Sequence, residues 1–422
     1  MSILLKNGVF IDWHTLEFTP ADIFLADDQK RIQLFYPGEA PADDTTVLDC
    51  NGMFITRSFT NAHHHAYSAL ARGMPPVTPP PQNFQEILEK IWWRLDKAIT
   101  REMIAISALV TAIESARAGV TFIIDHHSSP GQIEGSLETI ANAFEKTGLS
   151  HLLCYEISDR NGTNNTRRAF AETEEWLQQQ KALVGLHAAF TVSDATLSRA
   201  VRLADKYHTG IHIHVAEDKV DQEVCIINHG KRVVNRLAEA GVLNLQGTIL
   251  AHCIHLSDEE RSLIRNSESW IVTNCESNLN NGVGQFSSAR LGDRIMLGTD
   301  GMHSDMIKAL KASWFNQLRI DKRTPADMYH RLRNADRYLY ELSITNPNDQ
   351  NLVVFDYPSP TPVNADNWPA HLVFGVNNRH IRHVISNGQL IVRDYRITTV
   401  DEKAVYSEAR NLAGKLWETL KG

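Results

Sequence analysis

Three consecutive histidines, His63, His64 and His65, follow an apolar segment over residues 53–62. Side chains alternate between the two faces of an extended strand, so His63 and His65 share one face and His64 lies on the other. Two neutral imidazoles on one face of a strand provide half of a transition-metal site. Taken alone, the motif also fits a buried, hydrogen-bonded histidine pair.

Three further apolar segments end in side chains that can bind a metal. The first delivers His214 followed by Glu217, the second delivers His252, and the third delivers Asp300. His212, two residues before His214, is predicted to lie deeper in the core as a hydrogen-bonded histidine. Because a (β/α)₈ barrel carries its active site at the carboxyl ends of its parallel strands, these segments predict a metal site at that end of a barrel.

The composition limits the classes of protein that need to be considered. With 422 residues, 43% hydrophobic and 22% charged, the chain is long enough to bury a large core. A formal net charge of −8 and an isoelectric point near 6.2, with no basic stripe, exclude a nucleic-acid partner. Five widely spaced cysteines without a Cys-x-x-Cys pair predict a reduced, cytoplasmic location. No segment has the layout of a secretory signal or the length of a membrane span, so no membrane partner is expected.

The order of the predicted elements divides the chain into two units. Residues 1–55 contain short strands separated by turns, residues 56–349 alternate strands with long helices, and residues 350–422 return to strands before a closing helix. Strand–helix alternation is typical of parallel βα units. We therefore predict an α/β protein with a (β/α)₈ TIM barrel over 56–349 and a second, smaller β-sandwich domain built from both chain ends. Residues 221–240 are predicted to form one helix and residues 371–374 a strand.

The layout of a barrel between two β-rich ends, with His63-x-His65, His214-x-x-Glu217, His252 and Asp300 in this order, resembles the amidohydrolase superfamily. Within it, the chain is most similar to the chlorohydrolase and aminohydrolase branch that includes guanine and S-adenosylhomocysteine deaminases. Shorter motifs are similar to those of the SsnA-type aminohydrolases, and they lie at residues 92–96, 124–130, 277–281 and 297–301. The resemblance covers essentially the whole chain, and its metal motifs are more specific than its substrate motifs.

The resemblance implies a site for one divalent metal ion, zinc as the first expectation and iron as the second. Dinuclear members of the superfamily carry a carboxylated lysine at the end of the fourth barrel strand, and the corresponding residues 183–190 contain no lysine. One ion is therefore expected, and it would supply an activated water as the nucleophile. The implied metal ligands are His63, His65, His214 and Asp300.

The resemblance also implies roles for the groups around the metal. Asp300 accepts a proton from the attacking water, Glu217 delivers a proton as a general acid, and His252 polarises the nucleophile or the developing oxyanion. A solvated loop carboxylate is the alternative interpretation of Glu217, and a helix cap is the alternative interpretation of His187. The candidate substrate contacts are His187, His127 and Asn278.

We expect a metal-dependent hydrolase that attacks a non-peptide carbon–nitrogen bond in a small nitrogen heterocycle. Two reactions fit the residues equally, because both pass through a tetrahedral intermediate. They are hydrolytic deamination, with purine-like substrates favoured, and ring opening of a cyclic amide; hydrolytic dechlorination is a less favoured variant. A relative that binds a metal or ligand without catalysis is the non-enzyme alternative, but a structural metal site needs no general acid such as Glu217. The resemblance further implies a homodimer.

The chain departs from the superfamily pattern just before the first histidine motif. Members usually carry Pro-Gly near the start of the segment that leads to the first metal pair, and this chain has Arg57 and Ser58 there. Neither residue is an expected ligand, so the departure concerns how the first barrel strand begins.

Overall fold

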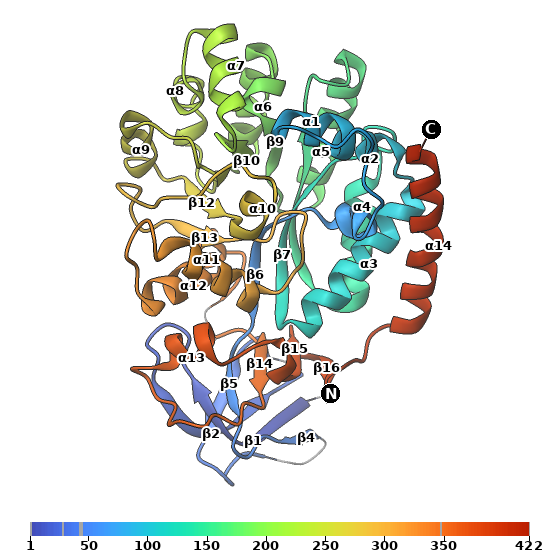
Figure 1. Ribbon diagram of the computed structural model, residues 1–422. Coiled ribbons are helices and arrows are strands. Elements are labelled where there is room, and N and C mark those ends of the chain that lie inside the picture. The colour runs from blue at the N-terminus through green and yellow to red at the C-terminus, as the bar shows by residue number, and fades with distance from the viewer. Residues whose placement is uncertain (1, 28, 42–44, 347, 422) are drawn as a thin grey trace.

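The computed structural model describes residues 2–27, 29–41, 45–346 and 348–421 of the chain. Eight parallel strands follow one another in sequence order around a barrel, and a smaller sheet lies beside the end of the barrel at which β6 begins (Figure 1). The barrel strands are β6 (Phe59–His64), β7 (Val120–His127), β8 (Ser150–Ile157), β9 (Val184–Ala188), β10 (Ile211–Val215), β11 (Ile249–His252), β12 (Trp270–Thr273) and β13 (Ile295–Leu297).

The last barrel strand meets the first at the residues that carry the histidine motif. The backbone N–H groups of Thr299 and Asp300 both donate to the carbonyl oxygen of His63, each at 3.0 Å. A parallel bridge between His64 and Asp300 lies at the same point. The contacts that bring β13 to β6 therefore also bring Asp300 to the histidines.

Helices surround the strands and bury one face against them. In α6, for example, Leu197, Ala200 and Leu203 are buried at helical spacing, and the Ser193 side chain caps the first turn. The barrel helices are α3 (Arg101–Arg117), α4 (Ser136–Thr147), α5 (Thr163–Gln179), α6 (Asp194–Lys206), α7 (Lys219–His229), α8 (Val233–Glu239), α9 (Asp258–Arg265), α10 (Cys275–Asn280), α11 (Met306–Gln317) and α12 (Pro325–Glu341). The single helix predicted over 221–240 is wrong, because Gly230 adopts φ +65° and ends α7 before α8 begins.

A helical segment precedes α3 and lies over the end of the barrel that carries the histidines (Figure 1). It consists of α1 (Phe84–Ile87), a π-helical turn η2 (Leu88–Trp92) and α2 (Trp93–Ala98). The Asn83 side chain accepts a hydrogen bond from the Glu86 backbone and so caps its start. A short 3₁₀ segment, η1 (Ala66–Ala71), connects β6 to this part of the chain.

The two chain ends together form the second unit, a mixed sheet of nine strands. β1 pairs with β2 along one edge and with both β4 and β5 along the other, so the sheet branches at β1. Its strands are β1 (Ser2–Ile11), β2 (Phe18–Leu25), β3 (Ile32–Phe35), β4 (Thr45–Asp49), β5 (Phe54–Arg57), β14 (Leu352–Phe355), β15 (Ile381–Ser386), β16 (Gln389–Arg393) and β17 (Arg396–Ile397). The barrel and a smaller β unit made of both chain ends are confirmed, with the strands of that unit hydrogen-bonded as one sheet.

The C-terminal range 350–422 divides between the two units. Its strands join the sheet, but helix α14 (Glu402–Lys421) packs against α3 and α2 of the barrel (Figure 1). The strand expected over 371–374 is wrong: these residues belong to helix α13 (Trp368–Phe374), which packs against α11 and α12. Pro369 suits the first turn of a helix, and the buried Trp368 and Leu372 stand one turn apart on one face. In the described residues, no helix has the length and apolar character needed to cross a membrane.

Candidate metal centre and active site

Side chains from four barrel strands or the turns that follow them converge at the carboxyl end of the barrel. Each offers a nitrogen or oxygen ligand atom, and one such atom from each residue lies within 4.8 Å of the others. The four residues are His63, His214, His252 and Asp300. His65 belongs to the same cluster, because its Nε2 lies 3.0 Å from Asp300 Oδ1 and 3.2 Å from His214 Nε2.

The spacing of these atoms fits a divalent cation. Ligand atoms that each lie about 2.1 Å from a tetrahedral metal are about 3.4 Å apart. His63 Nε2 lies 3.6 Å from Asp300 Oδ1, and His252 Nε2 lies 3.9 Å from Asp300 Oδ2. Both Nε2 atoms are buried without a hydrogen-bond partner among the described residues. Because buried polar atoms normally have a partner, these two atoms point to a bound ion.

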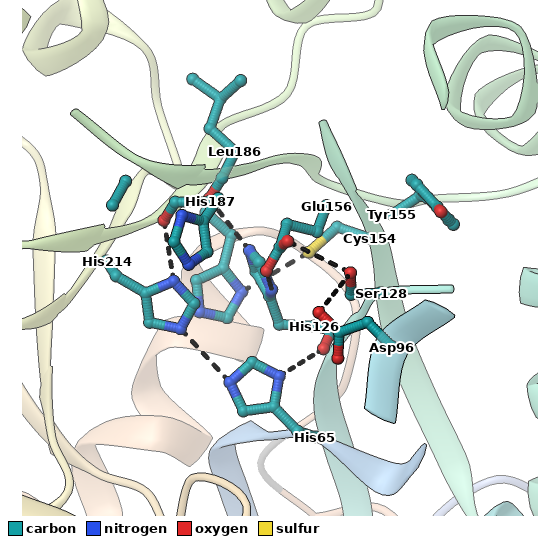
Figure 2. A network of polar contacts seen from close by, with 12 residues as sticks. His65, Asp96, His126, Ser128, Cys154, Tyr155, Glu156, Leu186, His187 and His214 are labelled. Atoms are coloured by element: carbon teal, nitrogen blue, oxygen red, sulfur yellow. Dashed lines mark hydrogen bonds and ion pairs between the residues drawn. The ribbon is translucent and has the colours of Figure 1, made fainter. Parts of the chain in front are cut away.

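The opposite ring nitrogen of each histidine is held by a hydrogen bond, which leaves Nε2 free to face the cluster. His65 Nδ1 donates to the carbonyl of His126 at 2.6 Å, and His214 Nδ1 donates to the carbonyl of His187 at 2.8 Å (Figure 2). His63 Nδ1 lies 2.8 Å from His212 Nε2, so His212 is the hydrogen-bonded core histidine that the sequence predicted. Such bonds set the tautomer and the orientation of metal-binding imidazoles.

The backbone is strained where the strands deliver these groups. Ala216, His252 and Asp300 have φ values of +47°, +71° and +54° in the left-handed region that non-glycine residues rarely adopt. These three residues follow or end β10, β11 and β13. Strained backbone of this kind persists where the surrounding structure holds it and gathers at functional sites.

Asp300 is the anionic centre of the cluster. Burial raises the pKa of its carboxyl group, but the adjacent imidazoles of His63 and His65 outweigh this effect and hold that pKa well below its usual value. The Ser277 hydroxyl donates to Asp300 Oδ2 at 2.5 Å. Burial lowers the pKa of His65, yet the adjacent Asp300 raises it to about 9. The ionised Asp300 therefore attracts positive charge to this point.

Glu217 lies beside the cluster and has the opposite preference. Burial, followed by the negative charge of Asp300, raises the pKa of the Glu217 carboxyl well above its usual value. Its Oε2 lies 3.5 Å from His252 Nε2, and its backbone N–H donates to Asp221 Oδ2 at 3.0 Å. The surroundings of this buried carboxyl group therefore favour its protonated form. This placement differs from the solvated loop carboxylate that was the alternative interpretation.

A pocket opens above the cluster of histidines and Asp300. The helical segment α1–η2–α2 contributes Phe84, Leu88, Trp92 and Trp93 to one wall. Charged and hydrogen-bonding side chains make up the rest of the lining: His65, Tyr67, Asp96, Glu156, His187, His214, Glu217, Ser277, Asn280, Asn281 and Asp300, together with Gly301 and Met302. The pocket can therefore receive a flat, apolar ring edge and several polar groups at once.

The three predicted substrate contacts lie in different places. His187 lines the pocket, and its Nδ1 lies 2.7 Å from Thr191 Oγ1. His127 is fully buried behind Tyr67, with Nε2 2.8 Å from Ser129 Oγ, and it is not among the lining residues described. Asn278 Oδ1 accepts a hydrogen bond from His252 Nδ1 at 2.7 Å and is also absent from the described lining. Of the three, only His187 is therefore among the described lining residues, while Asn278 is hydrogen-bonded to His252.

Comparison with known proteins identifies the family. A sequence model described as the amidohydrolase family matches residues 54–335, which is well over half of the chain. The chain belongs to the amidohydrolase family. The predicted resemblance to this superfamily and to its deaminase branch is confirmed.

Relatives of this amidohydrolase include a 5-methylthioadenosine/S-adenosylhomocysteine deaminase of Desulforudis audaxviator, 26% identical over the full length of both chains. A 5'-deoxyadenosine deaminase of Methanothermobacter thermautotrophicus is 26% identical over 89% of this chain and 91% of the relative. An adenosine deaminase from Xanthomonas campestris with bound zinc has the same fold, with a TM-score of 0.85, 18% identity and 98% coverage of both chains. The atrazine chlorohydrolase TrzN of Arthrobacter aurescens, complexed with zinc, has a TM-score of 0.82 at 16% identity, covering 97% of this chain and 100% of its own.

Two carboxylate residues in the pocket of this amidohydrolase were missed in the sequence. Glu156 closes the apolar strand β8, so the rule that identified His214 at the end of its strand would also have found Glu156. Asp96 lies on the short helix α2, and its spacing gives no indication that it reaches a pocket. Such a residue can be found only from the tertiary structure, because its position depends on how α2 lies over the barrel.

Proposed function

We propose that this amidohydrolase is a zinc-dependent aminohydrolase that deaminates a purine-like heterocycle. The observation that carries the proposal is the convergence of buried histidine Nε2 atoms on Asp300 at the floor of a pocket that also contains Glu217, a carboxyl group whose pKa is raised by burial. His63, His65, His214 and Asp300 would hold the ion, with His252 within reach of the same point. When bound, the ion supplies an activated water and stabilises negative charge that develops on the reacting centre.

Asp300 is placed to accept a proton from the attacking water. Its low pKa keeps the carboxylate ionised at neutral pH, so it can accept a hydrogen bond from that water. The Ser277 hydroxyl, at 2.5 Å, and the backbone bond to His63 fix the position of the carboxylate. The group is therefore preorganised as a base, with no rearrangement needed before the reaction.

Glu217 is placed to donate a proton to the substrate, whereas Asp300 accepts one from the attacking water. The protonated form of this carboxyl group can donate to a ring nitrogen as the tetrahedral centre forms, and the proton that Asp300 accepts from the attacking water can then pass to the departing amine. His252 faces Glu217 and Asp300 through Nε2, and its Nδ1–H is committed to Asn278. His252 can therefore orient the nucleophile or polarise it without exchanging its own tautomer.

The relatives support deamination over the other reactions in the same family. The proteins with 26% identity over nearly their whole length are named as deaminases of adenine nucleosides. The triazine-acting neighbours share the fold at much lower identity. Ring opening of a cyclic amide and dechlorination therefore rank behind deamination.

Ammonia release from adenosine and 5'-deoxyadenosine tests the proposal. The metal-loaded protein should release ammonia from at least one of them, and Glu217→Gln should reduce kcat by about 10²- to 10⁴-fold, the contribution of a positioned general acid. Glu172→Gln provides a matched control, because this buried carboxylate accepts backbone N–H groups at the start of α4, away from the pocket. Conversion without ammonia would indicate ring opening or dechlorination, and an unchanged rate in Glu217→Gln would overturn the assigned role.

Zinc as the resident ion, a homodimer and a cytoplasmic location are further parts of this proposal. Zinc suits a set of imidazole and carboxylate ligands with one position left for water. Metal analysis of the protein as purified, and light scattering coupled to size exclusion, test the first two. The five cysteines are buried free thiols in the structure, in agreement with the expected absence of disulfides.

A further inference from the structure

A buried acidic wall, defined here as Asp96, Glu156, Ser128 and Arg160, forms one side of the pocket. The Ser128 hydroxyl lies 3.1 Å from Glu156 Oε1 and 3.4 Å from Asp96 Oδ2, between the two carboxylates (Figure 2). Arg160 pairs with both: Nη2 lies 2.8 Å from Asp96 Oδ2, and Nη1 binds Glu156 Oε1. Two carboxylates thus share one guanidinium, and the wall has a net negative charge when both are ionised.

The carboxylates face the pocket while the guanidinium lies behind them. Asp96 and Glu156 are among the residues that line the pocket, and the described lining contains neither lysine nor arginine. Both terminal nitrogens of Arg160 are committed to the two carboxylates, and its guanidinium stacks 5.4 Å from the ring of Trp93. Arg160 is therefore not available to bind an anionic substrate in this pocket.

Unpartnered acceptor atoms lie on Asp96 of this wall and on His126, which adjoins Glu156 outside the described pocket lining. Asp96 is only 2% exposed, and its Oδ1 has no hydrogen-bond partner within 3.5 Å among the described residues. His126 Nε2 lies 3.1 Å from the carbonyl of Leu186 and must donate to it, which leaves Nδ1 as an acceptor 3.8 Å from Glu156 Oε2. That nitrogen is also buried without a partner. Buried acceptors gathered in this way can be satisfied by a donor from a bound molecule.

We propose that the acidic wall selects substrates that present a positively charged or N–H-donating nitrogen group, and that it disfavours substrates with a carboxylate or phosphate. The inference rests on the proposed deamination and names the substrate class of the same pocket. Glu156 also lies close to the metal centre, since one of its oxygens is within 4.8 Å of a ring nitrogen of His214. The donor group can therefore belong to the heterocycle itself or to a substituent next to it.

Two matched sets of probes test the preference with the metal-loaded enzyme. The ring set compares 2,6-diaminopurine with adenine, and the substituent set compares 5'-amino-5'-deoxyadenosine, 5'-deoxyadenosine and the 5'-carboxylate of adenosine. We expect kcat/KM to be at least tenfold higher for the donor-bearing member of one set, and at least tenfold lower for the carboxylate than for the neutral nucleoside. Equal values within both sets, or efficient turnover of the carboxylate, would overturn the inference.

Variants of the wall assign the preference to its residues. Asp96→Asn and Glu156→Gln should each reduce the ratio of kcat/KM between the donor-bearing and the neutral probe by at least tenfold. Glu172→Gln, a buried carboxylate outside the pocket, should leave that ratio unchanged. An unchanged ratio in both wall variants would contradict the inference, and thermal unfolding of each variant shows that the comparison is made on folded protein.

Binding measurements separate this inference from the proposed reaction. If none of the probes loses ammonia, deamination is refuted, but the order of affinities measured by thermal shift still tests the wall. If donor-bearing probes bind more tightly than neutral ones and the carboxylate binds more weakly, the inference about the wall is supported even though deamination is refuted. A second equivalent of metal bound with loss of the donor preference would show that an ion, and not the substrate, occupies the acidic wall.

Discussion

The hydrogen bond between His252 and Asn278 provides a sharp test of how the site is oriented. Asn278 Oδ1 accepts from His252 Nδ1 at 2.7 Å, and both side chains are buried. In Asn278→Ala the N–H of His252 loses its acceptor. A buried group left unpaired costs about 1–3 kcal/mol. If the unpaired N–H makes the reactive orientation of His252 less stable by this amount, kcat/KM falls about 5- to 150-fold.

The assay compares three variants with the parent enzyme. Asn278→Asp retains an acceptor for Nδ1 and should keep more activity than Asn278→Ala. Asn235→Ala, which removes an amide bonded to Glu259 on the outer surface, controls for the substitution itself. Metal content and thermal unfolding are measured for each protein. If folded, metal-loaded Asn278→Ala retains kcat/KM within twofold of the parent, then Asn278 does not orient a catalytic His252.

Three other outcomes follow from the structure. Chelation of the metal should abolish activity and lower the unfolding temperature, and about one equivalent of zinc should restore both; a requirement for two would contradict a mononuclear site. Arg57→Met should lower the free energy of unfolding by about 3 kcal/mol in thermal or urea unfolding, because it removes the guanidinium that the buried Asp336 and the partly buried Asp349 share; an unchanged unfolding temperature would show that this ion pair is dispensable. Burial raises the pKa of Asp96 to about 7, so the preference for a permanently protonated amine over a neutral probe should increase as pH rises through 7 and the carboxylate ionises; a ratio that is flat with pH in the parent, or that still rises in Asp96→Asn, would refute this.

The role of Arg57 also accounts for the departure from the superfamily pattern at the start of the barrel. Arg57 ends β5 of the sheet, and its guanidinium binds Asp336 on α12 and Asp349 just before β14. Arg333 completes the contact by donating to the carbonyls of Arg57 and Ser58. A buried ion pair therefore joins the sheet to the barrel at the place where the superfamily usually has Pro-Gly.

The candidate metal-binding groups and the class of fold could be predicted from the sequence alone. His63-x-His65, His214-x-x-Glu217, His252 and Asp300 could be identified because each follows a short apolar strand, and parallel strands of a barrel end on the same side. The same rule applied to β8 would have found Glu156. Local spacing is sufficient for such groups because the strand itself directs them.

Which other side chains reach the pocket depends on contacts that form only in the folded chain. Asp96 enters it because α2 lies across the barrel end, whereas His127 turns behind Tyr67, and Asn278 turns to His252. Residues 371–374 form a helix because their apolar side chains pack against α11 and α12. In each case the deciding contact joins residues far apart in the chain, and the local pattern of side chains contains no information about that contact.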